Sequence, residues 1–394
     1  MIYSKVWWPF SFSLKITVFF VFCLPILSSG CVSSGNNGSG KNIDNGNLVT
    51  IAEKFTLEKG DLFTKLKIKD PWQGANNVTQ VYYLVKRGDK IPDGSDSSGV
   101  IFVPVRKIIC TSTTHAAMIK ALGEENSISG MSGANYLYDK ALRDQAEKGF
   151  IKEVGYDSNM NKELLVRIKP DLVMVYGVGG ESSAYVGKLK ELGIKVLFNA
   201  DYLEIYPLRK AEWIKLFGAL YCKERIADSL FESEVTSYNN IRDLIRTKTT
   251  DRPKVLLGLP FRDSWYISPG NSFISNLIAD AGGTYLWEKE TSSVSMPFGI
   301  ESVFIKGQEA QYWLNTGTAS DKKDILALEP RLSELNCFKT GNLFNNNLRL
   351  SHDGGNDYWE SGSVYPHLVL ADIASILHPG VLANHELYFY RKLN

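Results

Sequence analysis

The clearest candidate for chemistry is a glycine-rich turn in the middle of the chain. The run GVGGES, residues 177–182, stands between an expected strand and an expected helix, and Asp201 follows the next strand. This order is typical of a dinucleotide-binding turn, in which glycines admit a pyrophosphate and an acidic side chain binds a ribose. Ser182 stands where a third glycine is usual. The alternative is a tight turn at the carboxyl edge of a parallel sheet, where such sheets bind ligands.

The five histidines do not have the spacing of a catalytic or metal site. His115 follows an expected strand and would either cap the next helix or contact a ligand. None of the others is paired at helical spacing around a carboxylate, as in zinc hydrolases. The chain also lacks the Gly-x-Ser-x-Gly turn of serine hydrolases. We therefore expect no catalytic residue, resident metal or cofactor.

The composition excludes several classes of function. Basic residues number 44 and acidic residues 43, so the net charge is +1 and no broad field would attract nucleic acid. Five cysteines give no disulfide framework, and Cys110, Cys222 and Cys337 are spaced as isolated core residues. A chain of 394 residues is long enough for two or three domains.

The first 31 residues have the pattern of a secretory signal. Lys5 and Lys15 precede the apolar run 16–27, which is too short for a membrane span of about 20 residues. Small residues then stand directly before Cys31, and this junction resembles the lipobox of bacterial lipoproteins. The resemblance implies that Cys31 is acylated and becomes the new amino terminus. Residues 32–47, rich in Gly, Ser and Asn, are expected to be a flexible tether.

The rest of the chain divides by its hydrophobic pattern. Residues 48–105 alternate apolar and polar side chains in short runs, which predicts a small β appendage. Residues 106–222 and 249–394 each predict alternating strands and helices, with a loop at 261–270. Such alternation is typical of a parallel sheet covered by helices on both faces. The predicted fold class is α/β, with two doubly wound, Rossmann-like lobes.

One long helix is expected to join the two lobes. Apolar residues recur every three or four positions over residues 223–248, without Gly or Pro. A helix of this length would reach about 35 to 40 Å, enough to run across two lobes. Residues 207–222 are expected to form a separate helix of the first lobe. Two lobes joined in this way leave a cleft between the carboxyl edges of their sheets, the default binding site.

Five segments, in this order, carry a family resemblance. They are RKIICTSTTHAAMIKALG (106–123), VGYDSNMNKELLVRIKPDLVMVYG (154–177), PLRKAEWIKLF (207–217), SWYISPGNSFISNLIADAGGTYL (264–286) and GGNDYWESGSVYPHLVLADIASILHP (354–379). The chain from about Arg106 to Leu393 resembles the helical-backbone (class III) substrate-binding proteins of ABC importers for iron siderophores, haem and cobalamin. The resemblance implies a monomer that binds a metal chelate and delivers it to an inner-membrane ABC permease. Its place would be the periplasm, lipid-anchored to an inner or outer membrane.

The resemblance also implies which residues serve the site. Glu163 and Glu301 match the two glutamates that meet permease arginines, although the helix dipole alone would favour an acid at each position. Aromatic and polar side chains are expected at the cleft, where they suit a large, partly apolar chelate, although each aromatic could instead belong to a core. The residues are Thr113, His115, Tyr136, Tyr176, Arg262, Trp265, Tyr266, Arg349, Tyr358 and Trp359, with the pair 265–266 foremost.

Two alternatives remain open at this point. One is an extracytoplasmic enzyme on a doubly wound scaffold, for which the turn at 177–182 is the support. The other is a surface lipoprotein that passes the chelate to an outer-membrane receptor.

Overall fold

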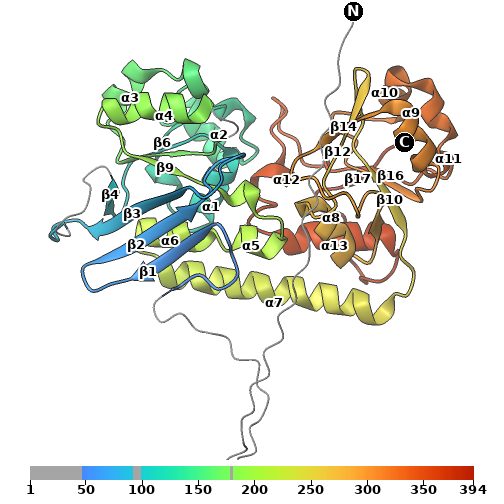
Figure 1. The fold of residues 1–394 in the computed structure, drawn as a ribbon, viewed down its shortest axis with the longest axis horizontal. Helices are drawn as coiled ribbons and strands as arrows, with labels where there is room; N and C mark the ends of the chain where they lie inside the picture. The colour runs from blue at the N-terminus through green and yellow to red at the C-terminus, as the bar shows by residue number, and fades with distance from the viewer. Residues whose placement is uncertain (1–46, 92–98, 178–180) are drawn as a thin grey trace, which may run out of the picture. The chain divides into compact units, whose positions relative to one another are not determined.

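The computed structural model describes residues 47–91, 99–177 and 181–394. The chain divides into two compact units, residues 1–43 and 44–394, and the described residues belong to the second. Cys31 and the predicted signal sequence lie outside the described residues. Two α/β lobes joined by one long helix, with a small β-sheet at the amino-terminal lobe, confirm the predicted fold class (Figure 1). None of the helices in the described ranges is long and apolar enough to cross a membrane.

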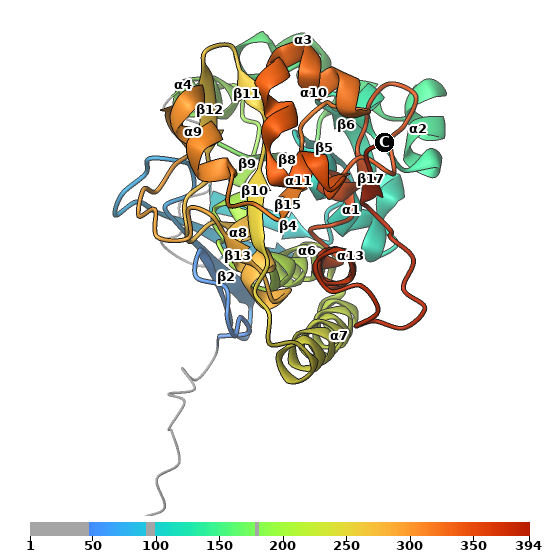
Figure 2. The ribbon, with the colours of Figure 1, turned by 90° about the vertical axis from the view of Figure 1, so that its right-hand side faces the viewer.

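The joining helix α7 (Glu224–Lys248) begins one residue after the predicted start and has 25 residues. Its side chains Ala227 and Phe231 belong to the core of the amino-terminal lobe, whereas Tyr238 and Ile245 belong to that of the other lobe. Figure 2 shows α7 nearly end-on, beside α13 (Pro366–Leu377). One continuous helix therefore contributes to both hydrophobic cores.

Two short helices precede α7 where one was predicted. They are α5 (Pro207–Ala211) and α6 (Ile214–Tyr221). Cys222 ends α6 in a left-handed conformation with φ of 56°, so α6 and α7 do not merge. A Cβ atom at Gly218 of α6 would lie 2.5 Å from that of Ala227, so glycine permits the close approach of these two helices.

The amino-terminal lobe is a five-stranded parallel sheet with helices on both faces. In sheet order its strands are β7 (Lys152–Glu153), β6 (Ile128–Met131), β5 (Ile108–Cys110), β8 (Leu172–Val175) and β9 (Val196–Phe198). Its other helices are α1 (Thr113–Ala121), α2 (Lys140–Glu147), α3 (Lys162–Ile168) and α4 (Glu181–Glu191). Ile108 and Cys110 share a cluster with α1 and α6, whereas Ile109 shares one with α3 and α4. Period-two alternation thus buries both faces.

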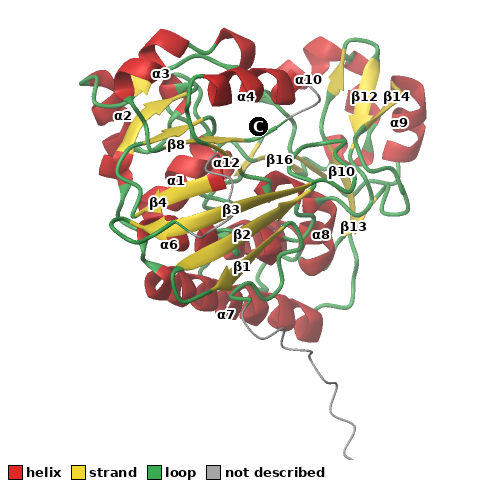
Figure 3. Cartoon of the chain, turned by 60° about the vertical axis from the view of Figure 1, so that its left-hand side comes forward, coloured by secondary structure: helices red, strands yellow, loops and turns green. Residues whose placement is uncertain are grey.

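The appended sheet contains β1 (Phe55–Lys59), β2 (Phe63–Lys69), β3 (Thr79–Lys86) and β4 (Val100–Val103). The first three strands are antiparallel, and β4 pairs with β3 in parallel. Figure 3 shows these strands, in yellow, beside α6. Phe55 packs on Trp213 with ring centroids 4.5 Å apart, and both rings are fully buried. The appended sheet therefore shares one hydrophobic core with the first lobe.

The carboxyl-terminal lobe has a second five-stranded sheet. Its strands in sheet order are β13 (Thr284–Tyr285), β10 (Lys254–Leu257), β15 (Tyr312–Leu314), β16 (Leu343–Asn345) and β17 (Arg391–Lys392). β17 is antiparallel to its neighbour, and the other pairings are parallel. Besides α13, the helices are α8 (Phe273–Asp280), α9 (Ile300–Gly307), α10 (Lys322–Leu328), α11 (Asn336–Lys339) and α12 (Asp357–Glu360).

The prediction of a loop over residues 261–270 is wrong. This region contains β11 (Pro260–Phe261) and β12 (Ser264–Ile267), which form an antiparallel hairpin, and β12 also pairs with β14 (Met296–Gly299). Arg262 makes the turn with φ of 55°. Hairpin turns with positive φ usually contain Gly or Asn, so a turn made by Arg262 could not be recognised from the sequence.

Candidate ligand-binding cavity

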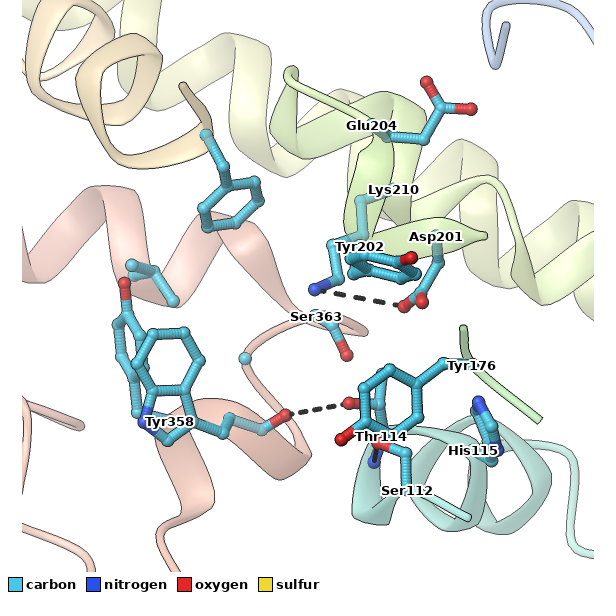
Figure 4. A pocket seen from close by; sticks show the side chains of 14 residues that line it. Ser112, Thr114, His115, Tyr176, Asp201, Tyr202, Glu204, Lys210, Tyr358 and Ser363 are labelled. Atoms are coloured by element: carbon cyan, nitrogen blue, oxygen red, sulfur yellow. Dashed lines mark hydrogen bonds and ion pairs between the residues drawn. The ribbon is translucent and has the colours of Figure 1, made fainter. Parts of the chain in front are cut away.

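A cavity of about 330 Å³ lies between the lobes (Figure 4). The amino-terminal side is mainly polar and consists of Ser112, Thr114, His115, Tyr176, Asp201, Tyr202, Glu204 and Lys210. The carboxyl-terminal side consists of aromatic and small residues, namely Phe273, Tyr358, Trp359, Gly362, Ser363 and Val369. Such a pairing suits a ligand with one apolar face and one hydrogen-bonding face.

Strand ends place the polar wall. Ser112, Tyr176 and Asp201 each follow the carboxyl end of a parallel strand, namely β5, β8 and β9. The carboxyl ends of parallel strands meet at one edge of a sheet, where open α/β sheets bind ligands. The cavity therefore lies at the edge that the strand–helix alternation predicts.

His115 is the most unusual group in this wall. Its side chain is fully buried in α1, and neither ring nitrogen has a hydrogen-bond partner in the protein. Burial, with a contribution from Lys210, lowers the pKa of His115 to about 3. The imidazole is thus neutral at physiological pH, with one nitrogen able to donate and the other to accept a hydrogen bond. Because buried polar groups usually have a hydrogen-bond partner, His115 is the first candidate for a polar contact in this wall.

Asp201 and Lys210 form the charged part of the wall. The Lys210 Nζ lies 3.9 Å from the Asp201 Oδ2, which has no hydrogen-bond partner in the protein. Burial raises the pKa of Asp201, and the Lys210 ammonium opposes this rise. Lys210 is the one basic side chain among the described residues that line the cavity. Because two acids, Asp201 and Glu204, line the same wall, the described residues give it little net positive charge.

Hydrogen bonds hold the lobes together beside the cavity. The Thr114 hydroxyl donates to the Trp359 carbonyl over 3.3 Å. The carboxylate of Glu360 accepts from the backbone N–H groups of Tyr138 at 2.7 Å and Asp139 at 2.9 Å. Glu360 is only 2% exposed. This single side chain from α12 therefore connects the carboxyl-terminal lobe to the backbone of the amino-terminal lobe.

Of the predicted ligand contacts, His115, Tyr176, Tyr358 and Trp359 line the cavity. Thr113 does not, although its two neighbours in the chain do. Tyr136 and Tyr266 are about half exposed, and neither belongs to the cavity wall. Arg262 is exposed at the hairpin turn.

Two further predicted residues have other surroundings. Trp265 is fully buried, stacks on Trp313 with centroids 5.7 Å apart, and donates its indole N–H to the Leu257 carbonyl. The prediction of a ligand contact is corrected here, because this ring belongs to the core. Arg349 lines a second cavity of about 360 Å³, where its guanidinium bonds Asp357 and lies over Tyr388.

Several lining residues were not predicted as ligand contacts. Ser112 and Tyr202 could have been found from their positions after strands, and Asp201 was considered only as part of a dinucleotide site. Lys210 and Phe273 lie on helices α5 and α8, so only packing brings them to the cavity. Within the described residues, no group of three or more His, Cys, Asp or Glu could hold a metal ion.

The two predicted docking glutamates are both exposed in the first turn of a helix, α3 for Glu163 and α9 for Glu301. Figure 1 shows these helices at the ends of the two lobes farthest from α7. Glu301 forms an ion pair with Arg331 at 2.6 Å, and both side chains are more than half exposed. Their positions permit contact with one partner surface.

Comparison with known proteins decides the family. The model of one protein family, described as "Periplasmic binding protein", matches residues 108–346, which is more than half of the chain. The chain belongs to this family. An uncharacterized lipoprotein of Methanocaldococcus jannaschii is 26% identical over 96% of this chain and 97% of its own length. An uncharacterized ABC transporter substrate-binding lipoprotein of Bacillus subtilis is 27% identical over 42% of this chain and 49% of its own length.

A solved structure shares the fold. A periplasmic heme-binding protein from Pseudomonas aeruginosa has a TM-score of 0.57 and 15% identity, over 74% of this chain and 98% of that chain. The resemblance that the five sequence segments carry to periplasmic binding proteins is thereby confirmed. Residues 178–180 of the glycine-rich run lie outside the described residues.

Glu360 predicts a pH dependence of stability. Burial raises the pKa of Glu360 from 4.5 to about 7. The backbone amides of Tyr138 and Asp139 oppose this rise, whereas the negative charges of the Asp357 and Asp139 side chains add to it. Of these acids, Asp357 is bonded to Arg349 and Asp139 to Lys120. The raised pKa favours the folded state fully below pH 4.5, and this contribution, about 3 kcal/mol, is lost as the pH rises through 7.

Glu360→Gln should remove this dependence, because glutamine does not ionise. Urea denaturation between pH 4.5 and 7.5 should show that the stability difference between the wild type and the variant changes by about 3 kcal/mol. Glu232→Gln, at an exposed position on α7, is the control and should parallel the wild type. A constant difference between wild type and Glu360→Gln would contradict the assignment.

Proposed function

We propose that this periplasmic binding protein is anchored by lipid at Cys31 and captures an iron chelate, siderophore or haem, for an ABC permease. Cobalamin is the alternative ligand. The observation that carries the proposal is the cavity between the lobes, lined by the aromatic Trp359 and Phe273 from one lobe and by the buried, unpartnered His115 from the other. Binding would use no covalent step, and release would follow docking at the permease.

The shape and chemistry of the cavity support a chelate as the ligand. A metal chelate offers flat apolar surfaces to aromatic rings and amide, hydroxyl or carboxylate groups to polar side chains. The cavity of about 330 Å³ is at the small end of the range for ligand sites. It would therefore enclose part of a large chelate and leave the remainder towards solvent.

Trp359 should contribute strongly to binding, because this residue is 58% exposed and lines the cavity. Isothermal titration of the wild type with ferric siderophores, haemin and cyanocobalamin should identify one chelate that binds. Trp359→Ala should weaken that chelate by roughly tenfold to thirtyfold, since burying an aromatic face contributes about 1.5 to 2 kcal/mol. Phe150→Ala removes an exposed ring from outside the cavity wall and should bind as the wild type does.

Two results would count against the proposed binding site. Failure of every chelate in the panel to bind the wild type would oppose the ligand class. Equal affinity of Trp359→Ala and Phe150→Ala would instead place the chelate elsewhere.

The proposed docking depends on Glu163 and Glu301. The double variant Glu163→Ala/Glu301→Ala should leave chelate affinity unchanged and reduce permease-dependent uptake severalfold, because exposed Glu–Arg pairs mainly orient partners. Arg331→Ala is the matched control, since it removes the ion pair within the lobe but keeps both glutamates. Unchanged uptake by the double variant would refute this role.

The proposed anchor at Cys31 is tested by fractionation. Cys31→Ser should move the protein from the membrane fraction to the soluble extracytoplasmic fraction, because residue 31 would no longer carry the lipid that anchors the chain. Cys222 is exposed, so its prediction as a core residue is wrong, and Cys222→Ser should stay at the membrane. Protease treatment of intact cells would then distinguish a surface location from a periplasmic one. Membrane retention of Cys31→Ser would show that another element anchors the chain.

A further inference from the structure

The appended sheet is joined to the cavity wall at two places. The first is the segment before β1, residues 50–54, whose backbone N–H groups point at two buried carboxylates. Glu212 accepts hydrogen bonds from the N–H groups of residues 50, 51 and 52 at 2.7 to 2.8 Å, and from the Thr50 hydroxyl at 2.6 Å. Glu204 accepts from the N–H groups of residues 53 and 54 at 3.0 and 2.9 Å.

These two carboxylates require their donors. Glu212 is fully buried and Glu204 is 3% exposed. Burial opposes ionisation of Glu212, but the hydrogen bonds from residues 50, 52 and 51 outweigh it and lower the pKa of this carboxyl. Outside this segment, Glu212 pairs with Lys215 at 3.1 Å and Glu204 accepts from the Trp213 indole N–H at 3.3 Å. Movement of residues 50–54 would still remove most donors of both buried carboxylates, which is unfavourable. Glu204 also lines the cavity, only six residues before Lys210.

The second junction is the turn after β2. Trp72 forms a parallel bridge with Gly177 and packs on Phe198 with ring centroids 5.3 Å apart. The backbone N–H of Gln73 donates to the Gly177 carbonyl at 3.2 Å and to the Tyr202 hydroxyl at 3.0 Å. The same hydroxyl donates to the Gly177 carbonyl. A Cβ atom at Gly177 would lie 2.6 Å from that of Trp72, so a glycine is required for this contact.

Both junctions therefore end on residues that line the cavity or stand next to them. Tyr176 precedes Gly177 and packs edge-to-face on Tyr202 with centroids 5.8 Å apart, and both rings line the cavity. The contacts of the appended sheet thus reach Tyr202 and Glu204 directly, and Tyr176 through its neighbour Gly177.

We propose that the appended sheet is a positioning part of the ligand site, in which Trp72 and Gln73 fix the rings of Tyr176 and Tyr202 against the ligand. This inference rests on the proposed function, because it assigns those rings to ligand contact. Trp72 is then a positioning residue, which acts through Gly177 and Tyr202 and does not line the cavity itself. The sheet would tune affinity and selectivity at one wall.

The test compares two aromatic truncations in the same part of the chain. Trp72→Ala removes the ring beside Gly177. Tyr83→Ala is the matched control, since this partly buried ring pairs with Phe63 at 5.3 Å and has no contact with the cavity wall. Trp72→Phe should restore the packing on Phe198. Tyr202→Phe keeps its ring but removes the hydroxyl that connects Gln73 to Gly177.

Hydrogen–deuterium exchange of the protein without ligand gives the first readout. Amides of residues 175–177 and 199–204 should exchange at least tenfold faster in Trp72→Ala than in Tyr83→Ala, and near the wild-type rate in Trp72→Phe. This readout needs no ligand, so it decides the positioning role even if no chelate in the panel binds. Equal exchange in Trp72→Ala, Tyr83→Ala and the wild type would overturn the proposal.

Ligand affinity gives the second readout, with the chelate that the wild type binds. Trp72→Ala and Tyr202→Phe should each weaken binding by roughly fivefold or more, while Trp72→Phe and Tyr83→Ala stay within twofold of the wild type. If Trp72→Ala and Tyr83→Ala lose affinity equally, with equal losses of thermal stability, Trp72 has a structural role alone and the proposal fails. If Trp72→Ala does not fold, Tyr202→Phe decides by the same two readouts.

Discussion

The binding site depends on one constraint: helix α7 joins the two lobes and packs in both of their cores. Helix α7 contributes Ala227 and Phe231 to one core and Tyr238 and Ile245 to the other, so it is anchored in both lobes. Helix α7 contains neither proline nor glycine, the usual causes of a sharp kink, so it crosses between the lobes as one uninterrupted helix. Both walls of the cavity are thus attached to one helix, and the hydrogen bonds of Glu360 add a further link between the lobes.

Burial determines the chemistry of the cavity more than formal charge does. His115 is neutral because its surroundings exclude water, and Asp201 is disfavoured as an anion for the same reason. The ammonium of Lys210 lies near both groups and influences both pKa values. The described wall thus presents hydrogen-bonding groups of low net charge opposite an aromatic face. Selection among ligands would then depend on shape and hydrogen-bond pattern.

Much of the fold could be predicted from local pattern. Residues 162–168 and 366–377 form helices with the predicted bounds, because clear start and stop signals surround an apolar stripe. The hairpin at 260–267 was missed because Arg262 adopts positive φ without a glycine or asparagine to mark it. Trp265 was misassigned for a related reason, since a tryptophan after a strand can point to a ligand or to the core, and only packing decides.

The sequence by itself determined the α/β class, the long joining helix and the family, since these depend on periodicity and on short segments in a fixed order. Tertiary structure alone brought Lys210 and Phe273 to the cavity, because their helices meet the strand ends only after packing. It also decided that the appended sheet shares the core of the first lobe and reaches Gly177 and Tyr202. Those contacts join residues more than a hundred positions apart, and no local pattern encodes which distant surfaces will meet.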